Sequence, residues 1–324
     1  MNLLEAGEAL SYEIAMGMDS PEAFDSPAGL LPEQDQRMKP FVSIIVPIFE
    51  QWTLIPEFLR CIRAQTYRNF ELLLVDNGSS ETLDPKGSPF RFRLLSCLTP
   101  GSYAARNFGA SAARGELLAF TDADCRPSER WLACAVENFR GSDDRRVLAG
   151  EIEMTAEHSS CPNVYEMYDI AIGIPQARYV MHGHAATANL IVPAGLFREL
   201  NGFDSSRFSG ADTEFCLRAT RSGAKLKYCL EAKVRHIARN SFEAHASKVR
   251  RIKGGQLLHG PLRDRISRGI RTLLPPLRAL LRISRSPNPR LLQKCPMFWL
   301  QLRLWGIEVG ELIRLVGLGK NPER

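Results

Sequence analysis

The chain has 324 residues, 44% of them hydrophobic, so it can bury a substantial core in one large domain or in a domain with an appendage. The first residues lack a basic region followed by an apolar stretch, and no run of about eighteen uncharged apolar residues occurs, so we expect neither a secretory signal nor an ordinary membrane span. The eight cysteines form no Cys-x-x-Cys pair, which indicates reduced, mostly structural thiols in a cytosolic protein.

The net charge of +6 is unevenly distributed along the chain. Residues 1–40 hold eight acids and two bases, together with several prolines, and we expect them to form a mobile leader. Residues 260–324 hold thirteen Lys/Arg and four Asp/Glu, a local charge of +9. These bases are interleaved with Leu, Ile and Trp rather than with stacking aromatics and glycines, which favours an anionic membrane surface or a partner helix over nucleic acid.

Strands and helices are predicted to alternate between residues 41 and 139. Short β-branched or apolar runs predict buried strands at Phe41–Pro47, Phe70–Val75, Phe92–Leu95 and Glu116–Thr121. Helical spacing of apolar or small residues predicts helices at Thr53–Gln65, at Tyr103–Ala113 with Ser102 as its cap, and at Trp131–Phe139, where Trp131 belongs to the core. Such alternation predicts βαβ units and therefore a mostly parallel sheet with helices on both faces.

The second half of the chain has a different pattern. An amphipathic helix is predicted at Asp212–Ser222, which Gly223 ends. Further strands are predicted at Val147–Glu153, Ala186–Val192, Ala224–Tyr228 and Ala232–His236.

The carboxyl ends of three predicted strands carry, in order, Pro47, Asp76 and the pair Asp122 and Asp124. In an open α/β sheet the ligand lies outside these ends. Two carboxylates spaced i, i+2 can share one ion only where the strand ends and turns. Mg²⁺ or Mn²⁺ carrying a diphosphate would suit such a pair, whereas a solvated turn is the simpler alternative.

Five blocks of sequence, in order, resemble the inverting, nucleotide-sugar-dependent glycosyltransferases of family 2, which have the GT-A fold. The resemblance covers about residues 41–240 and rests on VSIIVPIFEQ (42–51), AQTYRNFELLLVDNGSSE (64–81), GSYAARNFGASAARGELLAFTDAD (101–124), ATANLIVPAGLFRELNGFDSSRFSGADTEFCLRATRSG (186–223) and VRH (234–236). It implies a Rossmann-like GT-A domain, which we place at 41–259. The charge and apolar pattern of residues 260–324 predict that a basic, amphipathic helical tail follows it.

The resemblance also implies which residues bind the nucleotide-sugar donor. Pro47 and Glu50 would flank the pocket for the base and ribose, and Asp76 would hydrogen-bond the base. Arg106 would face the nucleotide or its phosphates. Its alternative role is a simple ion pair with the acids at the sheet edge.

The metal site and the catalytic base are implied in the same way. Asp122 and Asp124 would form the DxD pair, with Asp124 as the direct metal ligand and Asp122 nearer the ribose. His236 would add a further ligand to the Mn²⁺ or Mg²⁺ ion, or would be an ordinary strand-end histidine. Asp212 would be the general base that accepts the proton of the acceptor hydroxyl, although it could also cap its helix.

We therefore expect a metal-dependent inverting glycosyltransferase that acts in polysaccharide or glycolipid synthesis, with a saccharide or lipid-linked glycan as acceptor. A nucleotidyltransferase of similar fold would need a glycine-rich basic loop after the first strand, where the chain has Phe49-Glu50-Gln51-Trp52. A non-catalytic protein that binds nucleotide sugars is the other alternative, against which the intact set of aspartates argues.

The basic tail is expected to be helical and broken by prolines at 275–276, 287 and 289. Its last segment, Phe298–Leu318, places an apolar stripe on one side and carries Trp299 and Trp305 at positions suited to lipid headgroups. We expect a cytoplasmic protein, peripheral on the inner face of the membrane. Packing of the tail on the enzyme or on a second copy is the alternative.

Overall fold

The computed structural model describes most of the chain beyond the acidic leader. The predicted leader therefore lies outside the described residues except for Lys39 and Pro40, as do Pro287 and Pro289 in the tail. The described residues are 39–82, 92–139, 145–157, 161–286 and 291–319.

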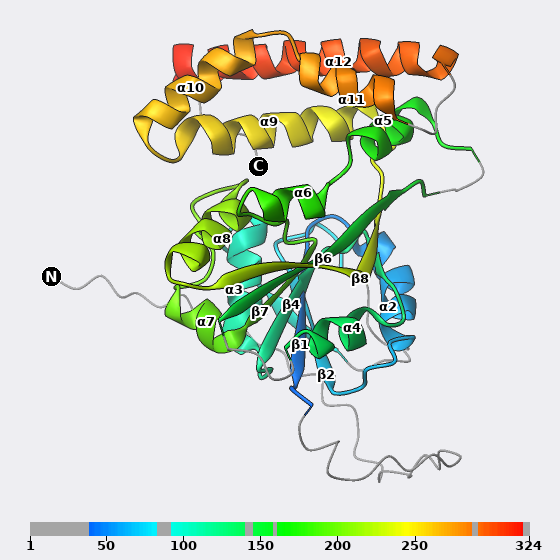
Figure 1. Cartoon of the computed structure of the whole chain (residues 1–324), viewed down its shortest axis with the longest axis vertical. Helices are drawn as coiled ribbons and strands as arrows, with labels where there is room; N and C mark the ends of the chain where they lie inside the picture. The colour runs from blue at the N-terminus through cyan, green and yellow to red at the C-terminus, as the bar shows by residue number, and fades with distance from the viewer. Residues whose placement is uncertain (1–38, 83–91, 140–144, 158–160, 287–290, 320–324) are drawn as a thin grey trace, which may run out of the picture.

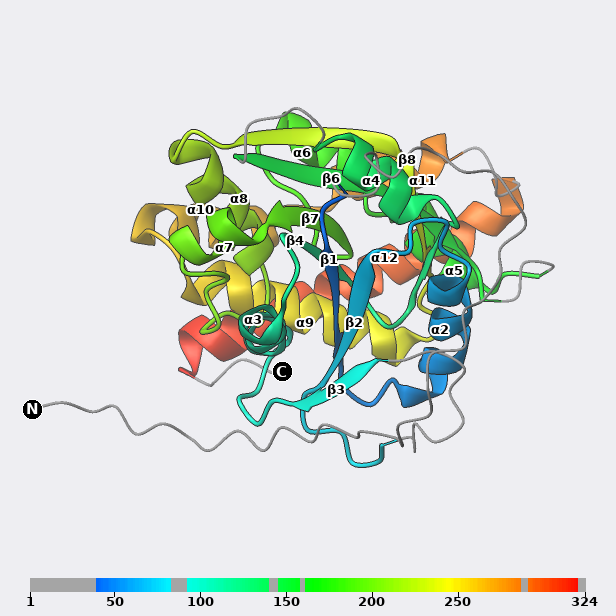
Figure 2. The ribbon, with the colours of Figure 1, turned by 90° about the horizontal axis from the view of Figure 1, so that it is seen from below.

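A mixed, mostly parallel sheet forms the centre of the molecule, and within the described residues it has eight strands in the order β3-β2-β1-β4-β7-β6-β8-β5 (Figures 1 and 2). Strands β3, β2, β1 and β4 run parallel, β7 is antiparallel to both β4 and β6, and β8 runs parallel to β6. The strands are β1 Val42–Ile48, β2 Phe70–Asp76, β3 Arg93–Ser96, β4 Leu117–Thr121, β5 Cys125–Pro127, β6 Arg146–Thr155, β7 Asn189–Pro193 and β8 Lys225–Ile237.

Helices cover both faces of this sheet, as the sequence predicted, because its central strands alternate their side chains between two apolar clusters. In β1, Ile44 and Val46 belong to one cluster while Ile45 belongs to the other. The first cluster includes side chains of α2 (Ile55–Arg63) and α4 (Trp131–Glu137). The second includes side chains of α3 (Ser102–Ala112), α7 (Ala194–Glu199) and α8 (Ala211–Arg221).

Two local predictions were wrong. Ser102 does not cap α3: the helix begins at Ser102 itself, and its N-cap is Gly101, whose backbone N–H donates to the Asn77 side chain (2.8 Å). The two closing strands predicted after residue 224 are a single strand, β8. Cys229 and Val234 are consecutive pairing residues of β8 with β6, and the residues between them are not paired with β6. This unpaired stretch interrupts the strand pattern in the sequence, which therefore predicted two strands.

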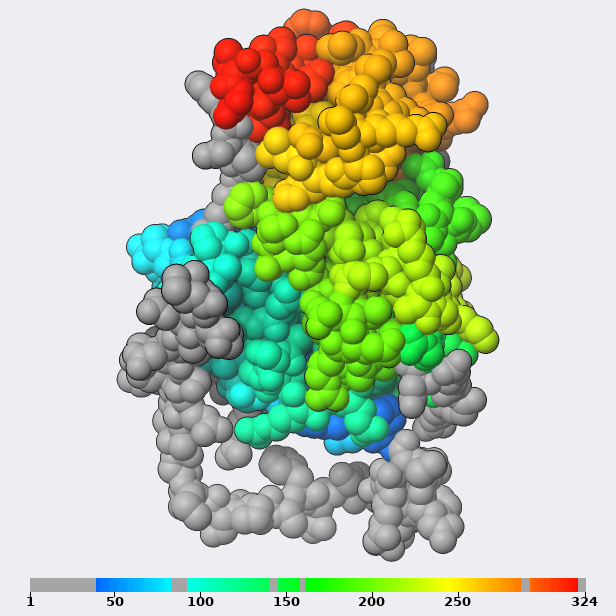
Figure 3. All heavy atoms as spheres, turned by 90° about the vertical axis from the view of Figure 1, so that its left-hand side faces the viewer, coloured from blue at the N-terminus to red at the C-terminus, as the bar shows by residue number. Residues whose placement is uncertain are grey.

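The carboxyl-terminal helices form a layer at one end of the molecule (Figures 1 and 3). This layer contains α9 (Phe242–Leu258), α10 (Leu262–Leu273), α11 (Leu277–Arg285) and α12 (Leu291–Leu312), which ends in a π-helical turn (Ile313–Gly317). It docks on α5 (Val164–Ile172) through a small apolar cluster whose buried members are Tyr168, Ile283, Met297, Leu300 and Leu304. The tail thus packs against the sheet domain of the same chain.

Helix α12 docks only in part through the stripe predicted for it, which comprises Phe298, Leu302, Trp305, Val309, Leu312, Ile313 and Val316. Phe298 packs against the cluster, but the buried Leu300 and Leu304 lie outside the stripe. The stripe residue Leu302 is exposed. Trp305 donates its indole N–H to the Thr272 carbonyl (2.8 Å), so its polar atom is satisfied inside the helical layer. Among the described residues, no helix combines the length and the apolar character needed to cross a bilayer.

Helix α10 turns its apolar side chains outward. Four of them, spaced along one face, are between 54% and 65% exposed: Leu262, Ile266, Ile270 and Leu273. The side of α10 that contacts the neighbouring helices includes Thr272, its one buried residue, whose hydroxyl accepts from the Lys253 amine (2.9 Å). The polarity of α10 is therefore reversed relative to a helix that packs on a core.

A buried carboxylate ties the helical layer to the sheet domain. Asp169 on α5 is 1% exposed and accepts hydrogen bonds from the Arg239 backbone N–H (3.0 Å), the Arg239 guanidinium (3.1 Å) and the Lys248 amine (3.1 Å). Burial raises the pKa of Asp169, but the charges of Lys248 and Arg239 more than offset this effect and lower the pKa below the usual aspartate value. Asp169 therefore connects α5, the end of β8 and α9.

We expect Asp169→Asn to lower the free energy of unfolding by roughly 3 kcal/mol at pH 7, because it leaves two buried cations without their carboxylate. Since the folded-state pKa of Asp169 is depressed, its contribution is complete above the usual aspartate pKa of about 4 and is lost as the pH falls toward the folded value. Thermal unfolding should therefore separate wild type and variant more at pH 7 than at pH 3. The exposed Asp264→Asn is the control, and an equal effect of the two substitutions would contradict this role.

Candidate active site

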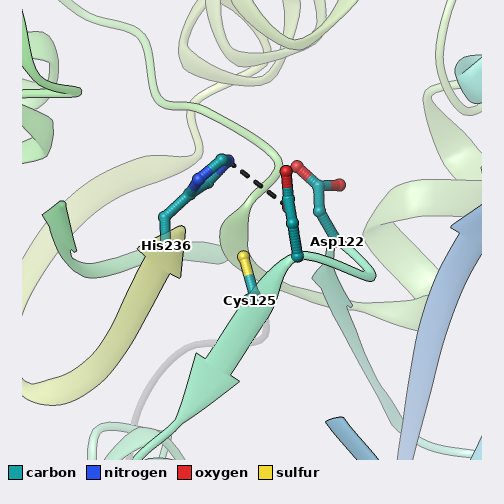
Figure 4. A group of neighbouring side chains, drawn as sticks. Asp122, Cys125 and His236 are labelled. Carbon is teal, nitrogen blue, oxygen red and sulfur yellow. Dashed lines mark ion pairs between the residues drawn. The ribbon is translucent and has the colours of Figure 1, made fainter. Parts of the chain in front are cut away.

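The two acids of the predicted pair lie where β4 ends and the chain turns into β5. The turn is closed by a hydrogen bond from the Cys125 backbone N–H to the Asp122 carbonyl (3.0 Å). The Thr121 hydroxyl donates to the Ala188 carbonyl (2.9 Å), which anchors the end of β4. Because the strand stops here, the carboxylates of Asp122 and Asp124 both come close to His236 near the end of β8. Figure 4 shows Asp122, Cys125 and His236 in this group.

Arg106 pairs with the first of these acids. Its guanidinium, buried on α3, makes a short ion pair with the Asp122 carboxylate. The same guanidinium lies 5.4 Å from the ring centroid of Tyr103, and its Nε is buried without a hydrogen-bond partner. The ion pair predicted as the simpler role of Arg106 is therefore present.

Asp124 and His236 form the second half of the cluster. The His236 Nε2 lies 3.5 Å from the Asp124 Oδ1, while its Nδ1 is 2.9 Å from the Ile237 carbonyl oxygen. The Asp124 Oδ1 is buried and has no hydrogen-bond partner. A buried carboxylate oxygen without a donor is costly, and a cation would remove that cost.

The ligand atoms of Asp122, Asp124, Cys125 and His236 all lie within 4.8 Å of one another. Two carboxylates and an imidazole suit Mn²⁺ or Mg²⁺, which prefer oxygen ligands. The thiol does not match such an ion: burial, followed by the charges of Asp124 and Asp122, raises the pKa of Cys125 well above its usual value. The arrangement therefore fits a hard divalent cation held by the carboxylates and His236.

A cavity of about 740 Å³ opens beside this cluster and brings together four of the predicted residues: Arg106, Asp122, Asp212 and His236. Asp212 lies in the first turn of α8 and accepts from the Thr213 backbone N–H (2.8 Å). The N-cap of α8 is Gly210, with φ of 83°, so the alternative role of Asp212 as a helix cap was wrong.

Pro47, Glu50 and Asp76 lie at the ends of β1 and β2, outside the residues that line this cavity. Asp76 accepts from the Trp52 indole (3.1 Å) and from the backbone N–H groups of the turn that follows it. Glu50 has a φ of 53° and accepts from the backbone N–H and hydroxyl of Ser80 (2.8 and 2.9 Å). Both acids hold the loops at these strand ends together.

The cavity also has a wall that the sequence did not predict. Helix α9 contributes Lys248 and Arg251, and the segment before it contributes Arg239. His184 also lines the cavity, next to Tyr179, and the two rings stack with their centroids 4.8 Å apart. The spacing of basic residues after His236 was the available signal, but the five recognised blocks ended there.

Comparison with known proteins agrees with this arrangement. The family model described as "Glycosyl transferase family 2" matches residues 43–151. Glycosyltransferase AglE of Haloferax volcanii is 31% identical over 237 residues, which cover 70% of this chain and 76% of that protein. The chain belongs to glycosyltransferase family 2. As a glycosyltransferase it is an enzyme. Its membership in this family argues against both alternatives, the nucleotidyltransferase and the non-catalytic binding protein.

More distant relatives agree with the family and the fold of this glycosyltransferase. The amylovoran biosynthesis glycosyltransferase AmsB of Erwinia amylovora is 24% identical over 196 residues, which cover 56% of this chain and 65% of that protein. The structure of a mannosyltransferase from Pyrobaculum calidifontis, in complex with GDP-Man and Mn²⁺, superimposes with a TM-score of 0.52 at 17% identity, covering 85% of each chain. That similarity supports the GT-A fold.

Proposed function

We propose that this glycosyltransferase moves a sugar from a nucleotide-diphosphate donor to a hydroxyl acceptor in a single, inverting displacement that depends on a divalent cation. The observation that carries the proposal is the unpartnered, buried Asp124 carboxylate oxygen beside a cavity that Asp122, His236 and Asp212 share. One side of the cavity is suited to a cation with its diphosphate, and another carries a carboxylate free of any ion pair among the described residues.

In this proposal Asp122, Asp124 and His236 hold the cation, Mn²⁺ or Mg²⁺. When bound there, such a cation supplies Lewis-acid stabilisation for the negative charge of the departing diphosphate. Arg106 keeps Asp122 in place through their ion pair. The solved mannosyltransferase of similar fold, which holds GDP-Man and Mn²⁺, supports both a nucleotide-sugar donor and a divalent ion.

Asp212 acts in the proposal as the general base. Its carboxylate lines the cavity from α8, an element separate from the acid pair, so it can accept a proton from an acceptor hydroxyl that approaches from that side. Attack on the face opposite the leaving diphosphate inverts the anomeric centre. Pro47, Glu50 and Asp76 are proposed to border the nucleotide base and ribose at the ends of β1 and β2.

The acceptor is proposed to be a saccharide or a lipid-linked glycan. The relative named for amylovoran biosynthesis supports a role in polysaccharide synthesis. The domain division proposed for the chain has the glycosyltransferase domain at 41–259 and the basic helical tail at 260–324.

We expect Asp124→Asn to abolish turnover and metal-dependent nucleotide binding, because it removes the carboxylate whose oxygen is buried without a partner. Turnover is measured as the release of nucleoside diphosphate from a panel of nucleotide sugars with Mn²⁺. Nucleotide binding is measured as the shift in melting temperature with nucleotide and Mn²⁺. The exposed Glu129→Gln is the control. Full activity of the wild type in excess EDTA would refute the dependence on a divalent cation.

Asp212→Asn should fold and bind the donor with wild-type affinity, yet transfer sugar at least about a hundredfold more slowly, because an amide cannot accept the proton. Initial rates with saturating donor and acceptor measure this loss, while the melting temperature with nucleotide checks binding. If the variant transfers at the wild-type rate, another residue is the base.

We also propose that the glycosyltransferase associates with an anionic membrane through the outer faces of α10 and α11. Exposed leucines and isoleucines on these helices alternate with exposed arginines, a composition that complements anionic headgroups above an acyl layer. The exposed arginines are Arg263, Arg271, Arg278 and Arg285. Each basic residue near such a surface contributes roughly 1 kcal/mol, so four provide a substantial attraction. A homodimer through the same face is the competing arrangement.

The double variant Ile266→Ser with Ile270→Ser should bind phosphatidylglycerol vesicles at least about tenfold more weakly than the wild type. Each isoleucine would bury apolar surface in the acyl layer on binding, and serine would not. Vesicle sedimentation at rising salt measures the affinity, which should fall as the charges are screened. The matched control replaces two exposed leucines of the sheet domain, Leu98→Ser with Leu230→Ser. Unchanged vesicle binding, or a dimer that only the α10 variant dissociates, would overturn the membrane proposal.

A further inference from the structure

The wall of the active-site cavity formed by the carboxyl-terminal helices is rich in cations. Residues of α9, of the turn that follows it and of α10 form much of this wall. Five of the cationic side chains lining the cavity come from α3, the segment after β8, α9 and α10: Arg106, Arg239, Lys248, Arg251 and Arg268.

These cations outnumber the carboxylates that neutralise them. Arg106 pairs with Asp122, whereas Arg239 and Lys248 share the single carboxylate of Asp169, each at 3.1 Å. Within the described part of the chain, neither Arg251 nor Arg268 makes an ion pair with a carboxylate. Asp264 of α10 lines the same wall, so the five cations face three carboxylates, those of Asp122, Asp169 and Asp264, and the wall keeps two excess positive charges.

Arg251 is the centre of this excess. Its guanidinium has five N–H donors, and in the described structure one hydrogen bond is formed, with the Phe208 carbonyl (3.3 Å). Arg268, from α10, likewise donates to a backbone carbonyl, that of Gln256 (3.2 Å). Both side chains thus keep donors available to a group in the cavity.

The cations of this wall also lower one another's pKa. Burial, and then the charge of Arg239, lowers the pKa of the Lys248 amine to about 8. Burial lowers the pKa of Arg251 as well, and the charges of Arg239 and Arg106 act in the same direction. Partly desolvated cations that repel one another are stabilised by an anion placed between them.

We propose that Arg251, with Lys248 and Arg268, forms a phosphate-binding subsite on the helical wall of the cavity, separate from the metal-binding acids. This inference rests on the proposed sugar transfer for its role in the reaction. The planar guanidinium fork matches the oxygens of a phosphate group in two parallel hydrogen bonds. The phosphate belongs either to the donor diphosphate or to an acceptor whose glycan is carried on a phosphate.

Helix α10 gives the subsite a connection to the proposed membrane face. Its first residues and Arg268 line the cavity, while Leu262, Ile266 and Ile270 on the same helix face outward and are exposed. A phosphate held at Arg268 and Arg251 would therefore lie behind a helix whose other face suits acyl chains.

Two phosphate probes test the subsite and distinguish its sources, both followed by titration calorimetry on the full chain. Pyrophosphate with Mn²⁺ represents the donor diphosphate, and decyl phosphate without metal represents a phosphate-linked lipid acceptor. We expect Arg251→Ala to weaken binding of at least one probe by about tenfold or more, since charge-assisted hydrogen bonds are lost. Loss confined to pyrophosphate assigns the subsite to the donor, and loss with decyl phosphate assigns it to the acceptor.

The control is Arg130→Ala, which removes an exposed arginine of the sheet domain that neither lines the cavity nor belongs to the proposed membrane face. Arg268→Ala, on a different helix, should weaken the same probe and keeps the test decisive if the Arg251 variant does not fold. Wild-type affinity of the folded variants for both probes would overturn the proposal. Because neither probe contains a sugar or a nucleoside, this result is independent of whether the proposed transfer reaction occurs.

Discussion

The placement of two half-buried carboxylates at the end of the central strand β4 is the constraint on which the active site depends. Asp122 and Asp124 repel each other and lose water, so the fold must supply positive charge close to them. Arg106 from α3 meets the first, and His236 from β8 approaches the second. One oxygen of Asp124 remains without a donor, and this deficit is what a divalent cation would correct. The arrangement links three segments that are far apart in the sequence.

The buried carboxylate of Asp169 holds the cationic wall of the cavity in place. Asp169 binds Arg239 and Lys248 and thereby holds α9 against the sheet domain. Arg251 of α9 and Arg268 of α10 line the cavity without an ion pair among the described residues, which gives an enzyme with paired acids and a group of cations in the same site. A phosphate group is attracted to the cations, and a divalent cation is attracted to the acids. Helix α10 links this site to the molecular surface, because it lines the cavity on one side and exposes apolar side chains on the other.

Residues whose environment is set within their own strand were predicted well from the sequence. Asp122 and Asp124 follow an apolar run that can only be a buried strand, and β1, β2 and β4 begin and end within a residue or two of their predicted bounds. Features that depend on a distant partner were missed. Gly101 caps α3 because Asn77 reaches it, and β8 continues through residues that β6 leaves unpaired. The docking face of α12 likewise follows from α5 rather than from its own apolar pattern.

The sequence by itself determined the alternation of strands and helices, the family, and the aspartates at the strand ends, because periodicity and short motifs are local properties of the chain. Only the tertiary structure decided that Arg106 is held by Asp122, that Asp212 lies beside the same cavity and that α9 closes it with cations. It also decided that α10 exposes its apolar side chains, since this depends on which face the neighbouring helices cover. Side chains from separate elements acquire their electrostatic environment only when packing removes water and brings them together.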